Sequence, residues 1–137
     1  MYQTVIIAGY LGRDPEMRYL PSGQPVTNFS VATSRKWTNQ DGSPGEETTW
    51  WKVSVWGKSA EACNKYISKG QRVLIEGRMS PDPDTGGPKI WIGHDGNPRA
   101  SFELVASTVK FIGGDEVKLS GVDDSAEVLP ESDDIPF

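Results

Sequence analysis

The chain has 137 residues, of which 36% are hydrophobic and 24% are charged, and its formal net charge is −5. This length fits one domain with a modest core, and the composition excludes a chain that is disordered throughout. The single cysteine, Cys63, excludes an internal disulfide. Together with the single histidine, His94, it forms no zinc-ligand pattern, so we expect neither a metal site nor a cofactor.

The charge is divided unevenly along the chain. Residues 115–137 contain eight acidic residues and one lysine, a net charge of −7, whereas residues 1–114 carry 13 basic and 11 acidic residues, a net charge of +2. No apolar run approaches the ~20 residues of a membrane span, and the N-terminus lacks a signal-peptide pattern. We therefore expect an intracellular protein with a folded domain over 1–114 and a flexible acidic tail over 115–137.

The first third of the chain predicts two strands. Residues 2–9 are rich in β-branched side chains, and Pro21-Ser22-Gly23 predicts a turn. Residues 26–35 then alternate, with Phe29 and Val31 on one side of a half-buried strand. The polar residues 39–45 predict the loop of a long hairpin.

Residues 48–58 predict a third strand with two unlike faces. One face carries Trp51, Val53 and Val55 and suits a buried core. The other carries two tryptophans that alternate with a cation and a hydroxyl, namely Trp50, Lys52, Ser54 and Trp56. That second face suits a planar and anionic ligand, such as an unpaired nucleic acid strand.

Residues 58–69 change to helical spacing, with Ser59 as the expected N-cap and Gly70 as the glycine after the end. Cys63 lies on the apolar side of this helix. We interpret Cys63 as a core residue, in preference to a reactive thiol, because no activating group lies near it in the sequence.

Residues 71–79 predict the fourth strand, with Val73 and Ile75 pointing inward and a bend or bulge at Gly77. Residues 80–98 are rich in Pro, Gly and Asp and form a long excursion outside the core, in which His94 is a surface residue. Trp91 within it either stacks on a ligand or pins the loop to the protein. Residues 101–112 predict the fifth strand.

Five strands with one short helix between the third and the fourth indicate an all-β chain. This is the element order of the OB-fold, a five-stranded and partly open Greek-key barrel. Other small barrels fit the pattern almost as well, and the place of the single helix favours the OB-fold.

An enzyme is not expected, because the sequence offers no pair of catalytic carboxylates, no nucleophile with a base and no phosphate loop. The stronger alternative is an OB module for RNA or oligosaccharides, since aromatic platforms also stack on those ligands. A second alternative places all the tryptophans in the core or in a subunit interface.

Several segments together resemble the family of bacterial single-stranded DNA-binding proteins. They are LGRDPEMRYLPSG at 11–23, FSVATSRKW at 29–37, TWWKVSVWGK at 49–58, YISKGQRVLIEG at 66–77 and DDIPF at 133–137. The resemblance implies an OB-fold that assembles as a homotetramer in the bacterial cytoplasm, associated with the nucleoid. It also implies binding of single-stranded DNA without sequence preference.

The resemblance implies base stacking on Trp37, Trp50 and Trp56. It further implies contacts to the DNA backbone from Arg18, Lys52, Lys58 and Lys69, and the charges of Arg35 and Lys36 suit the same task. The chain departs from the family at two places. Trp51 replaces a histidine often found at the subunit interface, and the excursion lacks the usual tryptophan in place, because Trp91 comes later.

The acidic tail ends in an apolar tripeptide, which a purely solvating tail does not need. A terminal ring and carboxylate together suit capture of the peptide in one pocket of a partner. The resemblance implies that this peptide recruits replication, recombination and repair proteins. The residues concerned are Asp133, Asp134, Ile135, Pro136 and Phe137.

Overall fold

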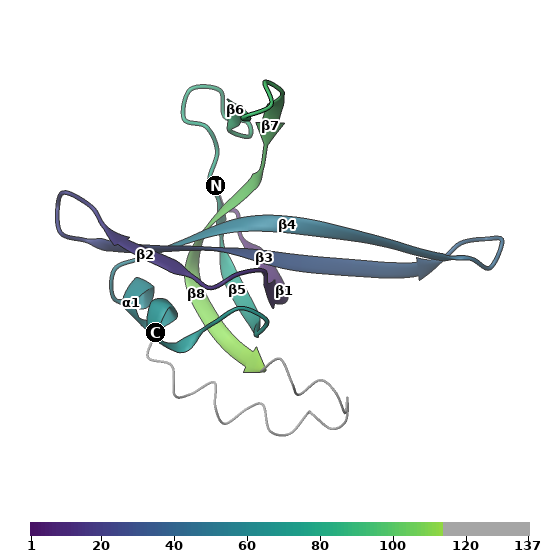
Figure 1. Ribbon diagram of the computed structural model, residues 1–137, viewed down its shortest axis with the longest axis horizontal. Helices are drawn as coiled ribbons and strands as arrows, with labels where there is room; N and C mark the ends of the chain where they lie inside the picture. The colour runs from purple at the N-terminus through teal and green to yellow at the C-terminus, as the bar shows by residue number, and fades with distance from the viewer. Residues whose placement is uncertain (114–137) are drawn as a thin grey trace.

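The computed structural model of the protein describes residues 1–113, and the predicted acidic tail lies outside these described residues. Eight strands and one helix follow one another along the described chain (Figure 1). They are β1 (Val5–Leu11), β2 (Glu16–Tyr19), β3 (Pro25–Thr38), β4 (Pro44–Trp56), α1 (Lys58–Tyr66), β5 (Arg72–Met79), β6 (Ile90–Ile92), β7 (Pro98–Ala100) and β8 (Phe102–Gly113).

The strands form a five-stranded barrel of OB type, as predicted. The sheet order is β1-β5-β8-β4-β3-β2, and an additional pairing of β1 with β3 closes the barrel. All pairings within this sheet are antiparallel except that of β4 with β8. Helix α1 lies between the third and fourth barrel strands, β4 and β5, which is the place that the sequence predicts.

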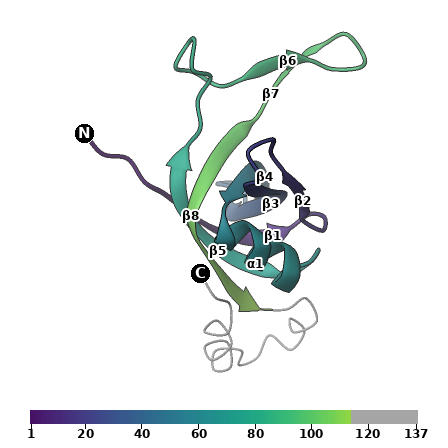
Figure 2. The same ribbon diagram turned by 90° about the vertical axis from the view of Figure 1, so that its left-hand side faces the viewer.

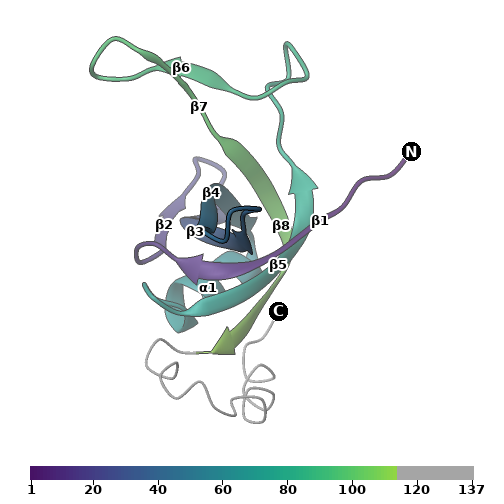
Figure 3. The same ribbon diagram turned by 90° about the vertical axis from the view of Figure 1, so that its right-hand side faces the viewer.

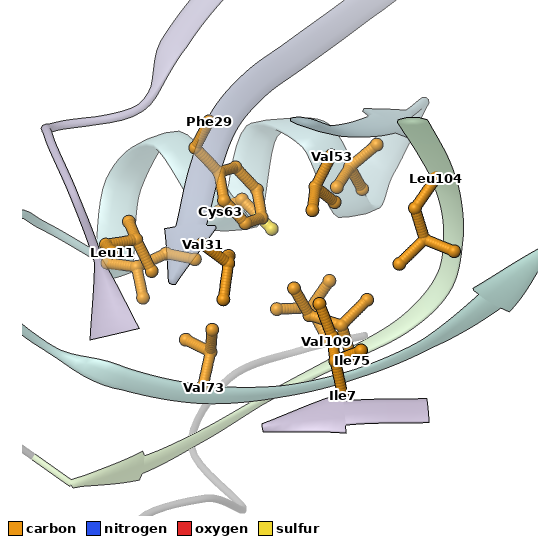
Figure 4. Close-up of a cluster of buried hydrophobic side chains, with 12 residues drawn as sticks. Ile7, Leu11, Phe29, Val31, Val53, Cys63, Val73, Ile75, Leu104 and Val109 are labelled. Atoms are coloured by element: carbon orange, nitrogen blue, oxygen red, sulfur yellow. The ribbon is translucent and has the colours of Figure 1, made fainter. Parts of the chain in front are cut away.

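The core fills the barrel with the alternate side chains of its strands (Figure 4). The predicted inward residues Phe29, Val31, Val73 and Ile75 are all buried. Cys63 of α1 is also fully buried, which confirms its place in the core. Burial raises the pKa of the Cys63 thiol from its ordinary 9.0 to about 12.

The bulge predicted at Gly77 is present. The register of β5 against β8 shifts between Glu76 and Gly77. The backbone of Gly77 lies so close to β8 that a side chain there would collide with the carbonyl group of Val105. Glycine thus permits the close approach of two strands where the barrel bends.

The boundaries of the helix differ from the prediction. The N-cap is Gly57, with a φ of 71° and no side-chain cap hydrogen bond, so Ser59 is not the N-cap. The helix ends at Tyr66, short of residue 69, because Ile67 already has extended backbone angles and its side chain turns into the core. Gly70, with a φ of 89°, belongs to the following turn.

Several strand ends also differ from the prediction. The first strand runs from Val5 to Leu11, later than the predicted 2–9, and β3 and β4 each extend several residues further toward their shared loop. These extensions form an arm, the distal part of the β3–β4 hairpin (residues 33–49), which projects from the barrel (Figure 1). Strand β2 was not predicted, and it pairs with the start of β3 through the expected turn at Pro21-Ser22-Gly23.

The excursion between β5 and β8 contains a hairpin of its own. Strands β6 and β7 pair antiparallel in a separate two-stranded sheet that stands beyond the end of the barrel (Figures 2 and 3). In its turn, the backbone N–H of Asn97 donates to Asp95 and lowers the pKa of that carboxyl. The prediction of an excursion outside the core holds, but the hairpin within it was missed.

Among residues 1–113, no helix has the length and apolar character needed to cross a membrane.

Candidate functional site

The outer face of β4 is the clearest candidate surface, and it divides from the core face as the sequence predicts. Val53 and Val55 are 1% exposed, whereas Trp50 and Trp56 are 54% and 42% exposed. Lys52 is exposed between the two tryptophans, and Ser54 is half-buried. The outer face of β4, defined as Trp50, Lys52, Ser54 and Trp56, therefore presents two aromatic rings and a cation to solvent.

The neighbouring strand β3 adds small side chains to this face. Ser30 pairs with Lys52, Ala32 pairs with Trp50, and Asn28 pairs with Ser54. The Ser54 hydroxyl donates to the Asn28 side-chain oxygen over 2.8 Å. Short side chains on β3 leave the larger side chains of β4 standing above the sheet.

A groove of about 530 Å³ runs over this face, between β2 and the start of the excursion. Four cations line it: Arg13, Arg18, Lys52 and Lys89. Three carboxylates line it as well: Asp14, Glu16 and Glu103. The remaining wall includes Asn28, Ser54 and the ring of Trp56, so the groove combines an aromatic ring with hydrogen-bonding groups and an excess of one positive charge.

Trp50 lies beside the groove in a second hollow of about 360 Å³, which shares Arg13, Ser30 and Lys52 with it. Its ring lies directly on Gly12, where a Cβ atom would come within 2.6 Å of the indole. The absence of a side chain at Gly12 therefore allows the Trp50 ring to lie against the backbone. The sequence did not predict this contact, which joins β4 to the residue that follows β1.

Trp91 of β6 is brought to the same surface. The Lys52 ammonium lies 4.5 Å from the centre of the Trp91 ring, within the range of a cation–π interaction. The ring is still 39% exposed. The contact with Lys52 agrees with the pinning interpretation, and a stacking role for the exposed part of the ring stays a prediction.

Trp37 is held differently from the other candidate tryptophans. Its register partner is Gly45 of β4, and the ring lies against that glycine. Arg35 lies 4.6 Å from the ring centre and forms an ion pair of 3.3 Å with Glu47. Because side chains alternate along β3, Trp37 and Arg35 lie on the side of the arm opposite Trp50.

The other predicted cations are not all gathered in the groove. Lys36 lies on the arm opposite Glu46 of β4. Lys58 starts α1 and Lys69 follows the helix; both are exposed and neither lines the groove. The structure instead adds Arg13 and Lys89, which sequence reasoning did not select. Arg13 lies in the same segment, 11–23, as Arg18, so this segment could have indicated Arg13 as well.

Trp51 belongs to the core face, as its position in the strand predicts. It is half-buried and packs against the core cluster, with its ring centre 5.6 Å from that of Phe102. Its indole N–H donates to the Thr33 hydroxyl over 3.1 Å.

Within residues 1–113, no three His, Cys, Asp or Glu side chains gather as a metal site requires.

Comparisons with known proteins place this chain in a family. Residues 2–112 match the family described as "Single-strand binding protein family". A single-stranded DNA-binding protein of Neisseria meningitidis serogroup A is 41% identical over 110 residues, which cover 80% of this chain and 59% of that protein. One of Helicobacter hepaticus is 39% identical over 112 residues, which cover 82% of this chain and 62% of that protein. The chain thus spans about three fifths of the length of these relatives.

Among solved structures, the chain resembles one described as the Plasmodium falciparum SSB complex with ssDNA. The TM-score is 0.66 at 23% sequence identity, and the match covers 81% of this chain and 95% of the other. At this identity the likeness concerns the fold, and it confirms the predicted barrel.

Proposed function

The chain belongs to the single-strand binding protein family, and from this premise we propose that it binds single-stranded DNA without sequence preference. The observation that carries the proposal is the outer face of β4, where Trp50 and Trp56 are exposed on either side of Lys52. This proposal concerns binding and not catalysis, in keeping with a family named for binding.

The geometry of the outer face suits an unpaired strand. The two tryptophans are six positions apart in the strand, which is about 20 Å at ~3.3 Å per residue. Two rings at that spacing can stack on separate bases of one strand, and stacking tolerates any base because every base has a π-face. Lys52, Arg13 and Arg18 line the groove and can neutralise phosphates between the stacked bases.

Recognition of a duplex fits this chain poorly. The major groove of a duplex admits an α-helix as a reading element. Helix α1 has nine residues, buries Ala60, Ala62 and Cys63, and accepts a 2.6 Å hydrogen bond from Thr27 at the carbonyl of Ala60. This helix serves the packing of the barrel.

The arm extends the proposed path of the strand. Trp37 is 37% exposed and Arg35 lies over its ring, while Lys36 lies on the opposite side of the arm. We propose that the strand reaches Trp37, Arg35 and Lys36 by passing around the edge of the arm, and that Lys58 and Lys69 contact phosphates beyond the groove.

Titration of the intrinsic tryptophan fluorescence with oligo-dT at several salt concentrations tests the proposal. We expect strong quenching, with an affinity that falls as salt rises, because bound phosphates release counterions. The same titration with a neutral oligosaccharide and with an RNA of equal length is the control for the alternative OB modules. Equal responses to all three ligands, or no quenching by oligo-dT, would contradict the proposal.

We also propose a homotetramer, as the resemblance implies. The outward face of β1 supports it, because Ile6 and Tyr10 there are 60% and 46% exposed. Exposed apolar side chains on the outward face of the barrel favour association with another copy. Light scattering of the protein in solution should give four times the chain mass of 15.0 kDa. A mass of 15.0 kDa at micromolar concentration is the contrary result.

For the tail, we propose that residues 133–137 recruit replication, recombination and repair proteins at the nucleoid. The acidic pair followed by an apolar tripeptide supports this role. Deletion of Asp133–Phe137 should abolish partner binding and leave or raise the affinity for DNA. Normal partner binding by the truncated chain would refute the recruitment role.

A further inference from the structure

One carboxylate stands inside the proposed DNA groove and holds one of its cations. Glu103 of β8 accepts an ion pair from the Lys89 ammonium at 3.3 Å, and its side chain is only 21% exposed. The hydroxyl of Ser101 donates to the other oxygen of the same carboxylate over 3.2 Å. Both oxygens of Glu103 are therefore engaged, and the group is held in one orientation.

The surroundings of Glu103 are those of the binding surface. Glu103 is the register partner of Lys52 in the parallel pairing of β4 with β8, so the two side chains are neighbours on one face. Lys52 in turn places its ammonium against the ring of Trp91. Glu103, Lys89 and Lys52 all line the same groove.

We propose that Glu103 is an internal counter-ion that occupies Lys89 in the free protein and that a phosphate of the bound strand displaces. This inference rests on the proposed function and adds a residue that limits the affinity for single-stranded DNA. Lys89 has the charge that a phosphate requires, but Glu103 already neutralises it. Binding then exchanges one anion for another at Lys89, and little affinity is gained there.

A purely structural role explains the pair less well. Ion pairs that remain partly in water contribute little to stability, and the Lys89 side chain is 42% exposed. A carboxylate in a groove for an anionic ligand also repels that ligand. Both points favour an effect of the Lys89–Glu103 pair on the affinity for DNA over an effect on stability.

A double-mutant cycle of Lys89→Gln and Glu103→Gln tests the inference, with oligo-dT affinity measured over a range of salt. Glu103→Gln should raise the affinity at low salt by about 2- to 5-fold and steepen the dependence of log affinity on log salt by about 0.7. Lys89→Gln should change the affinity by less than about twofold in the parent chain, and should remove most of the gain in the Glu103→Gln background.

Glu16→Gln is the matched control. Glu16 lines the same groove and is exposed, and it forms no ion pair within residues 1–113, so its loss removes one negative charge without releasing a cation. In that background the effect of Lys89→Gln should be as small as in the parent chain. If Glu103→Gln does not fold, Lys89→Gln alone tests the inference. A loss of oligo-dT affinity as large as that caused by Lys52→Gln would then contradict it.

The outcomes separate the two proposals. Equal effects of Lys89→Gln in all backgrounds, or weaker binding by Glu103→Gln, overturn the counter-ion role of Glu103 while DNA binding stands. A parent chain that does not bind oligo-dT at all overturns the proposed function and this inference together.

Discussion

Trp50 and Trp56 carry the binding proposal at the scale of single residues. Both are exposed, and the ring of Trp50 rests on Gly12. A ring that already rests on its neighbour loses little conformational freedom when a base stacks on it.

Replacing either tryptophan by alanine should therefore weaken binding of oligo-dT. The expected loss is about 1–3 kcal/mol for each stacked base, or about 5- to 150-fold in affinity. The melting temperature should change less than on truncation of a core residue, because about half of each side chain is exposed. Trp→Phe at the same positions is the control and should keep most of the affinity. An unchanged affinity in both alanine variants refutes the stacking role.

Cys63 gives a prediction that concerns the core. Burial raises the pKa of its thiol to about 12, from an ordinary 9.0. The folded protein therefore keeps the thiol neutral, and this contribution to stability is full below pH 9 and declines as the pH rises from 9 to 12. At pH 8 a thiol-specific reagent should leave the native protein unmodified and react once urea unfolds it. Rapid reaction of the native protein would show that Cys63 is accessible.

At the scale of elements, the β-bulge of β5 determines how closely β5 packs against β8. Gly77 allows β5 to approach the carbonyl of Val105 in β8, and the register shift at this point re-aligns the two strands. A side chain at position 77 must push these strands apart.

Gly77→Ala should consequently destabilise the protein by about 1–3 kcal/mol. The measurement is the midpoint of urea unfolding. Gly87→Ala is the matched control, since a Cβ atom there meets only the Thr85 hydroxyl at 3.7 Å. Equal midpoints for the two variants would mean that the bulge can adapt to a side chain.

Sequence and structure also agree to different degrees at this scale. The two faces of β4, the inward residues of β5 and the bulge at Gly77 could be predicted, because side-chain alternation and glycine act locally. The hairpin of β6 and β7 could not. Its strands have three residues each, and its place beside the groove involves the contact of Trp91 with Lys52, a residue distant in the sequence.

Over the whole molecule, the barrel gathers residues that the sequence keeps apart. The groove joins Arg13 and Arg18 from the β1–β2 region with Lys52 of β4 and Lys89 of the excursion. Sequence reasoning selected Arg18 and Lys52 but not Arg13 or Lys89, because only the closed barrel brings these segments together. The family resemblance implies stacking on Trp37 as well as on Trp50, and the register of the arm puts these two residues on opposite sides.

The most direct test of the central claim uses the five tryptophans as reporters. Their indole N–H signals can be assigned by NMR with single Trp→Phe variants and then followed as oligo-dT is added. The signals of Trp50 and Trp56 should shift most, and that of Trp51 should shift least, because its N–H donates to Thr33 on the core face. A large shift at Trp51 with none at Trp50 and Trp56 would contradict binding at the outer face of β4.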